Sequence, residues 1–199
     1  MAEASPTRVV VLVRGINVGR AKQVAMRDLA AALEDVGGSG VRTYLRSGNA
    51  VMDVALPTGR GRAAATRVAT ALGTLGAAVE EALLVRSGVS ARVLLVTAEH
   101  LRAVAAANPF PDLVGSPKQL HVLFCETQPD PAVLAGLGRR HGDDEIVVGD
   151  GVLYVGYRGG PGATGSPLEK VLPKLRMTTT ARNWTTVGAL VGLCDGAAS

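Results

Sequence analysis

The amino-acid sequence predicts an α+β protein made of two ferredoxin-like halves with antiparallel sheets, followed by a C-terminal helix. In residues 1–97 the expected elements follow the order strand–helix–strand–strand–helix–strand, which is the split βαβ pattern. Residues 98–199 repeat most of this order. Hydrophobic residues make up 47% of the 199-residue chain and charged residues 19%, which is typical of globular domains. We therefore expect one domain in residues 1–97 and a second in residues 98–199.

Each element of the first half has a local sequence signal. Residues 9–13 form a fully apolar, β-branched run, which predicts a central strand buried on both faces. Apolar side chains then recur at helical spacing over residues 26–36, and two glycines follow as a stop signal. Residues 41–45 and 50–54 predict a hairpin around the turn at residues 46–49.

The rest of the first half is predicted as a loop, a helix and a strand. Residues 57–62 are rich in Gly and Arg and indicate a loop. A further helical stretch is expected at residues 63–72, before a helix that runs from about Leu75 to Gly88. The apolar run at residues 92–96 closes this half as a strand.

The second half opens with a helix at residues 98–107 and a turn with the sequence NPFP. After it we expect a strand at 120–124, a helix at 131–137, a hairpin of strands 145–148 and 152–155, and a helix at 167–175. A C-terminal helix at 182–193 takes the place of a clear last strand. The repeat of topology therefore looks incomplete at its end.

Composition and charge exclude several classes of function. The net charge is +4, and residues 1–97 carry twelve Lys and Arg against seven Asp and Glu, which favours anionic partners. Only six aromatic residues are present, too few for a base-stacking platform. Two cysteines and three scattered histidines match no metal-site spacing, so we expect no metal and no cofactor. With no long apolar run and no signal peptide, a cytoplasmic protein that does not bind membranes is expected.

One glycine motif is better explained as a connecting loop than as a cofactor-binding site. Residues 160–165 match G-x-G-x-x-G between an expected strand and an expected helix. No parallel strand follows, and no acidic residue stands about 20 positions on, as a dinucleotide site requires. We interpret the segment as a hairpin-to-helix connection. No nucleophile or general-base motif is present either, so whether the chain is an enzyme stays open.

Topology brings two polar segments to one edge of the first sheet. The first two strands of a split βαβ unit run parallel, so the loop that follows residue 13 and the tip of the hairpin lie together. A glycine-rich, basic loop that leads into a helix is suited to hold an anion. The candidate ligand-binding residues at this edge are Arg14, Gly15, Asn17, Gly19, Ser47 and Asn49. Arg182, Asn183 and Trp184 are added as a second wall. Asn183 or a neighbouring Thr is expected to cap the last helix, with Arg182 and Trp184 projecting from its first turn.

Several longer segments resemble a known family. VLVRGINVGR, VRTYLRSGNAVMDV, NPFP, YVGYRGGPGATGSPLEKVL and TTTARNWTTV, in this order, are similar to the bacterial "domain of unknown function 1697" family over about residues 8–193. The resemblance implies an α+β fold of two ferredoxin-like halves and brings no known activity or catalytic residue. Two departures are Arg20, where a second Gly is expected, and an Ala/Gly/Arg-rich insertion near residues 55–74, expected as a surface feature.

The function expected from the residues is binding of a small anionic ligand, such as a nucleotide or a phosphorylated metabolite, at the glycine-rich loop and hairpin edge. Three alternatives stay open: a nucleic-acid-binding module, an enzyme of unknown reaction and a purely structural dimer. The nucleic-acid alternative is supported by the basic charge of the first half. Its other support is an analogy at the level of fold, because folds of this shape bind RNA elsewhere. The sequence leaves the oligomeric state undetermined.

Overall fold

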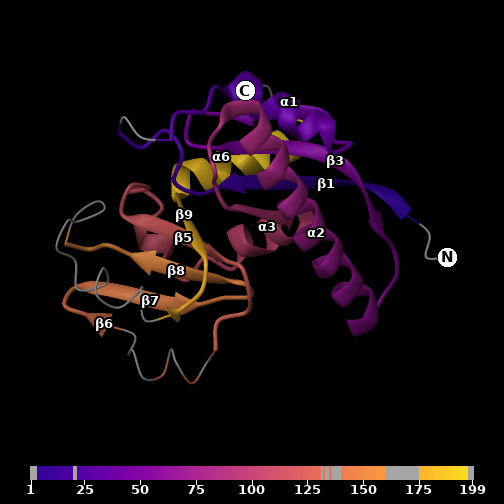
Figure 1. Ribbon diagram of the computed structural model, residues 1–199. Coiled ribbons are helices and arrows are strands. Elements are labelled where there is room, and N and C mark those ends of the chain that lie inside the picture. The colour runs from indigo at the N-terminus through magenta and orange to yellow at the C-terminus, as the bar shows by residue number, and fades with distance from the viewer. Residues whose placement is uncertain are drawn as a thin grey trace. The chain divides into compact units, whose positions relative to one another are not determined.

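The computed structural model describes residues 4–19, 22–130, 132, 135, 140–159 and 175–196 (Figure 1). Its contacts divide the chain into two compact units. Unit 1 comprises Met1–Leu101 with Leu190–Ser199, and unit 2 comprises Arg102–Ala189.

Unit 1 has the predicted split βαβ order. Its elements are β1 (Ala4–Val13), α1 (Met26–Asp35), β2 (Ser39–Tyr44), β3 (Asn49–Pro57), α2 (Arg62–Ser87) and β4 (Val93–Thr97). The sheet has the strand order β2-β3-β1-β4, and every neighbouring pair is antiparallel. The predicted α+β class with antiparallel sheets is therefore confirmed.

Strand β1 is central, as its apolar run predicts, because it pairs with β3 on one side and β4 on the other. Val9, Val11 and Val13 pack in the core of unit 1 with residues of α1 and α2. Val10 and Leu12 alternate with them and are also fully buried, so both faces of β1 are covered.

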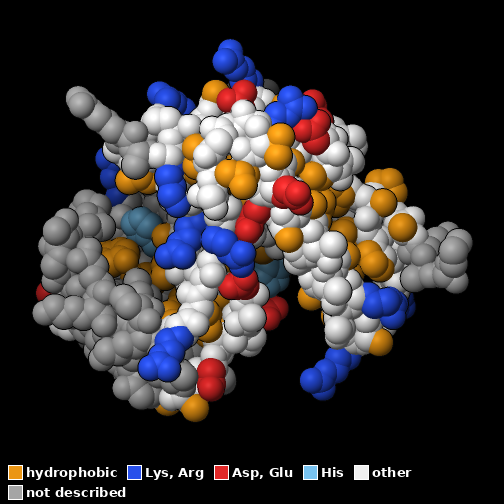
Figure 2. Space-filling view, in the orientation of Figure 1, with side chains coloured by type: hydrophobic (Ala, Val, Ile, Leu, Met, Phe, Trp, Pro, Cys, Tyr) orange, Lys and Arg blue, Asp and Glu red, His pale blue; other side chains and the backbone are white. Residues whose placement is uncertain are grey.

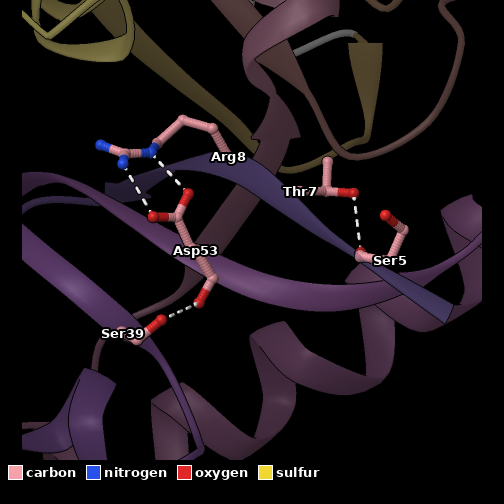
Figure 3. Close-up of polar contacts among 5 residues, drawn as sticks. All are labelled: Ser5, Thr7, Arg8, Ser39 and Asp53. Carbon is pink, nitrogen blue, oxygen red and sulfur yellow. Dashed lines mark hydrogen bonds and ion pairs between the residues drawn. The ribbon is translucent and has the colours of Figure 1, made fainter.

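β1 and β3 continue past the end of β4 and form a two-stranded ribbon, in which Ala4 pairs with Pro57. At the base of this ribbon, Ser39 of β2 still pairs with Asp53. Arg8 and Asp53 lie directly opposite each other there (Figure 3), and the Arg8 Nε and Nη2 atoms each donate a 2.7 Å hydrogen bond to the Asp53 carboxylate. The Ser39 hydroxyl of β2 donates to the Asp53 carbonyl oxygen at 3.4 Å. This half-exposed ion pair fixes the register where the ribbon leaves the sheet.

Helix α2 corrects the prediction for residues 57–75. The sequence suggested a loop, a separate helical stretch and then a helix, whereas α2 is a single helix of 26 residues. The Ala/Gly/Arg-rich segment at 55–74 therefore comprises the end of β3, a short loop at residues 58–61 and the first half of α2, so the loop predicted at 57–62 is largely confirmed. Gly76 lies inside this helix. Glycine is favoured at this position because a Cβ there would lie 3.2 Å from Leu95 and 3.3 Å from the Val93 carbonyl oxygen. Close packing on β4 thus outweighs the low helix propensity of glycine.

By length and composition alone, α2 could cross a membrane, since one 18-residue window has a mean hydropathy of 1.5. A core helix of a soluble protein passes the same test, and Val79 and Leu83 of α2 are fully buried in the core of unit 1. Only 17% of the window is buried, however. In Figure 2, hydrophobic side chains are visible at the surface over α2 and the outer ends of β1 and β3.

The second sheet lies in unit 2. The remaining elements are α3 (Ala98–Ala106), the short 3-10 helix η1 (Pro111–Leu113), β5 (Leu120–Cys125), β6 (Arg140–His141), β7 (Asp144–Val148), β8 (Val152–Gly156), β9 (Thr179–Asn183) and α6 (Trp184–Cys194). The strand order is β6-β7-β8-β5-β9, again antiparallel throughout. The order β7-β8-β5-β9 repeats the order β2-β3-β1-β4 of unit 1, and β6 is an added edge strand.

Strand β9 corrects the prediction that a helix at 182–193 replaces the last strand. Residues Thr179–Asn183 pair with β5 in continuous register, from Cys125 opposite Thr179 to His121 opposite Asn183. The segment TTARN has no apolar alternation, so its sequence does not indicate a strand. The C-terminal helix itself is confirmed, and it begins at Trp184.

Several predicted segments of the second half fall outside the described residues. They are the Gly-rich motif at 160–165, the helix at 167–175 apart from Leu175, and the helix at 131–137 apart from Ala132 and Ala135. Among the described residues of unit 2, Leu123, Ile146, Leu153, Val155 and Leu175 form a buried apolar cluster.

Candidate functional site

The described part of the glycine-rich loop, residues 14–19 and 22–25, begins where β1 ends, and backbone hydrogen bonds hold its start on both sides. The Val13 amide donates to the Gly48 carbonyl oxygen at 2.8 Å, and the Arg14 amide donates to the Arg92 carbonyl oxygen at 2.8 Å. Leu12 of β1 pairs with Asn49 of β3, so the loop and the hairpin turn of residues 45–48 lie at the same end of the sheet. This juxtaposition is the one that the topology predicted, and we call these two segments the loop edge.

Asn17 fastens the loop to the turn. Its side-chain Nδ2 donates to the carbonyl oxygens of Val24 at 2.9 Å and Arg46 at 2.6 Å, and its Oδ1 accepts from the Val24 amide at 2.9 Å. Its backbone φ of 56° lies in the left-handed region, which asparagine tolerates better than most residues. Three hydrogen bonds occupy this side chain within the protein, so Asn17 shapes the loop.

Asn49 and Ser47 close the turn in a similar way. Asn49 is fully buried, and its Nδ2 donates to the Tyr44 carbonyl oxygen at 3.1 Å and to the Ser47 hydroxyl at 2.9 Å. Gly48 has a φ of 77°, and a Cβ there would lie 2.8 Å from the Val13 Cβ and 2.9 Å from the Ile16 Cδ1. The SGN segment is therefore explained by turn geometry and close packing against β1 and the loop.

Positive side chains at the loop edge are exposed. Among the described residues, neither the Arg14 nor the Lys22 side chain has a hydrogen-bond or ion-pair partner. The Arg46 Nη2 makes a long 3.4 Å hydrogen bond to the Gln23 side chain. The Glu80 carboxylate accepts hydrogen bonds from the Val93 amide and from Arg92, and not from Arg14, Lys22 or Arg46. The edge therefore presents positive charge that these contacts do not neutralise.

The loop backbone has a repeated left-handed pattern. Gly15, Asn17 and Gly19 have φ values of 66°, 56° and 62°, and the residues between them are not in the positive-φ region. The Asn17 amide donates to the Lys22 carbonyl oxygen at 3.0 Å. The amides of Gly15, Val18 and Gly19 have no partner among the described residues. Alternation of this kind is typical of backbone nests that bind anions.

The residues of the proposed second wall lie in unit 2, and one of them, Arg182, differs from its prediction. Arg182 is part of β9 and not of the last helix, and it is buried, with Nη1 bonded to the Thr180 hydroxyl and the Ala181 carbonyl oxygen at 2.8 Å each. Burial lowers the pKa of its guanidinium to about 10. Trp184 is the first residue of α6, and its amide donates to the Pro117 carbonyl oxygen. Asn183 caps the helix as expected, because its Oδ1 accepts from the Thr186 amide at 2.9 Å.

Sequence reasoning missed two apolar residues at the loop edge. Val18 is 73% exposed and Leu45 is 57% exposed. Each is adjacent in sequence to one partner of the 2.6 Å bond between Asn17 and Arg46. The sequence signal for both is an aliphatic residue inside a turn. The hydrophobic pattern, however, predicts Leu45 as the end of a strand, and Val18 stands within the glycine-rich motif.

Comparison with known proteins identifies the family. Residues 7–154 match the family described as "Protein of unknown function (DUF1697)". The chain belongs to the DUF1697 family. The DUF1697 chain is also similar to a solved structure, described as conserved bacterial protein SP0830 from Streptococcus pneumoniae, with a TM-score of 0.66 and 21% identity over 96% of this chain and 99% of that one. This likeness shows a shared fold. No curated protein matches the chain.

Proposed function

We propose that the loop edge of unit 1 binds a small anionic ligand, such as a nucleotide or a phosphorylated metabolite. The observation that carries the proposal is the pair of exposed cations, Arg14 and Lys22, that have no partner among the described residues on a loop held by backbone hydrogen bonds. A preorganised cationic loop binds an anion without the cost of ordering itself.

The roles of the residues follow from their contacts. Arg14 and Lys22 supply charge, and the amides of Gly15, Val18 and Gly19 supply hydrogen-bond donors. Gly15 and Gly19 allow the left-handed backbone that directs those amides. Asn17, Ser47 and Asn49 act as scaffold residues, because their hydrogen bonds hold the loop and the turn. Arg182, Asn183 and Trp184 are left out of this site.

The proposal is tested by calorimetric titration with inorganic pyrophosphate. We expect saturable binding that weakens at least tenfold in the double variant Arg14→Ala, Lys22→Ala. The control is Arg60→Ala, because Arg60 is an exposed arginine between β3 and α2, at the opposite end of the sheet. Equal affinity of the wild type and the double variant would overturn the proposal, as would no binding at millimolar pyrophosphate.

The same titration separates a small ligand from nucleic acid. A polynucleotide partner binds by releasing counterions, so its affinity falls steeply with salt according to the number of phosphates neutralised. A single anion on two cations depends on salt far less. If single-stranded RNA bound much more tightly than pyrophosphate, and with a steep salt slope, the nucleic-acid alternative would replace the small ligand.

We also propose that the protein resides in the cytoplasm. Cys125 and Cys194 are not bonded to each other, and burial raises the pKa of the Cys125 thiol to about 11, which keeps it protonated. A reducing compartment suits two cysteines that form no disulfide. Fractionation of the native organism tests the location, and recovery outside the cytoplasm would overturn it.

A further inference from the structure

The exposed apolar residues of the loop edge are unexplained by the fold. Leu45 has a φ of 55°, a conformation that bulky residues avoid and that Gly or Asn would adopt at lower cost. Its side chain is also 57% exposed, so it contributes little to the core. Neither backbone preference nor packing accounts for leucine at this position. Strain of this kind is found at sites that contact ligands.

Val18 is a second exposed aliphatic residue, and it lies on the neighbouring turn. It follows Asn17, and Leu45 precedes Arg46, so the 2.6 Å bond between Asn17 and Arg46 holds the two aliphatic residues on adjacent turns. Arg14, Lys22 and Arg46 come from the same two segments. An apolar pair accompanied by three cations is complementary to a molecule that joins an apolar group to an anion.

We propose that the ligand of the loop edge is a nucleoside phosphate, with its base on Val18 and Leu45 and its phosphate on Arg14, Lys22 and the loop amides. This inference rests on the proposed function, to which it adds the class of ligand. Two aliphatic side chains match the face of one planar base, whereas sugar phosphates and inorganic phosphate have no apolar group to place there. A lipid bilayer is a poorer fit, since the pair offers far less apolar surface than a single myristoyl chain, which itself binds membranes only marginally.

The test compares three phosphate probes on the full-length chain: adenosine monophosphate, ribose 5-phosphate and inorganic pyrophosphate. We expect adenosine monophosphate to bind at least tenfold more tightly than ribose 5-phosphate. Leu45→Asn keeps a residue that tolerates positive φ but removes the apolar group, so it should abolish that preference and leave ribose 5-phosphate binding unchanged. Val18→Asn should act in the same direction. Val114→Asn, at a 47% exposed valine of unit 2, is the matched control and should change nothing.

The outcomes separate the two proposals. If pyrophosphate and ribose 5-phosphate bind but adenosine monophosphate binds no better, or if Leu45→Asn keeps the preference, the base-binding inference is wrong and the anion site stands. If none of the three probes binds, both are wrong. Binding of phosphatidic acid vesicles without binding of adenosine monophosphate would also overturn the inference. Thermal unfolding of Leu45→Asn at or above the wild-type midpoint shows that its loss of binding is not a loss of folding.

Discussion

The side-chain amide of Asn17 donates a 2.6 Å hydrogen bond to the carbonyl oxygen of Arg46, and this bond joins the glycine-rich loop to the hairpin turn. The same side chain makes two further bonds to the backbone of Val24, where the loop approaches α1. One residue thereby connects the first part of the loop, the end of the loop before α1 and the turn between β2 and β3. The shape of the loop edge depends on it.

Replacing Asn17 should therefore destabilise the protein. Asn17→Ala removes three hydrogen bonds and places alanine at positive φ, so we expect the free energy of unfolding to fall by about 2–4 kcal/mol. Asn17→Gly loses the bonds but relieves the backbone, and its loss should be smaller by about 1 kcal/mol. Urea denaturation of both variants measures the two losses. Unchanged stability in Asn17→Ala would contradict the fastening role.

Two glycines with similar backbone angles should respond differently to alanine. Gly48 and Gly15 have φ values of 77° and 66°, but a Cβ meets Val13 and Ile16 at Gly48 and nothing within 4 Å at Gly15. Gly15→Ala should cost about 1–2 kcal/mol through its backbone alone. Gly48→Ala should cost about 1–3 kcal/mol more because of overpacking. Thermal or urea unfolding checks the difference, and equal losses would show that packing at Gly48 is unimportant.

The register of the β1–β3 ribbon gives a prediction that depends on salt. Arg8 and Asp53 form a bidentate pair that is partly exposed, so a double-mutant cycle with Arg8→Ala and Asp53→Ala should yield a coupling of about 0.5–1 kcal/mol. The coupling should shrink in 1 M NaCl because exposed charges are screened. A coupling that is absent at low salt would mean that the pair contributes nothing to the register.

His121 should make stability depend on pH. Burial lowers the pKa of its imidazole below the usual 6.5, and its Nδ1 is buried with no hydrogen-bond partner in the described part of the chain, with Tyr157 packed edge-on against the ring. The unfolded chain therefore takes up the proton first. The contribution of His121 to the free energy of unfolding is greatest above pH 6.5. It falls as pH drops below this value, by up to about 1.4 kcal/mol per pH unit, until the folded form is protonated as well.

Comparison with His121→Phe isolates this contribution. The variant keeps an aromatic ring beside Tyr157 but cannot titrate, so the difference in unfolding free energy between it and the wild type should vary with pH only below about 6.5. Urea denaturation at several pH values from 5 to 8 measures that difference. A difference that stays constant over this range would rule out His121 as its source.

Local sequence signals predict the strand order of unit 1, but they do not predict the full length of α2 or the last strand of unit 2. The apolar run of β1 and the hairpin signal fix the sheet order, and the order alone brings the glycine-rich loop beside the SGN turn. Strand β9 was missed because TTARN has no strand pattern, and only its pairing with β5 makes it a strand. The continuity of α2 is not predicted because Gly73 and Thr74, which lie between the helical stretch at 63–72 and the helix from Leu75, have low helix propensity, yet both lie inside the single helix.

The candidate site was predicted in position but not in detail. Asn17, Ser47 and Asn49 were expected to face a ligand, since their polar side chains suit either a ligand or a turn, and sequence does not distinguish the two. Only their partners in space show that they hold the scaffold. The left-handed conformation of Leu45 is also invisible in the sequence, because no turn signal places a leucine there.

The measurement that tests the central claim most directly is a two-dimensional ¹H–¹⁵N NMR titration of the full chain with inorganic pyrophosphate. The amide resonances of Gly15, Val18 and Gly19 should shift together along one saturable curve, and Arg14→Ala should reduce the shifts while leaving the rest of the spectrum in place. If these three amides stay unmoved at saturating pyrophosphate, or if the responsive amides lie elsewhere in the chain, the loop edge is not an anion-binding site.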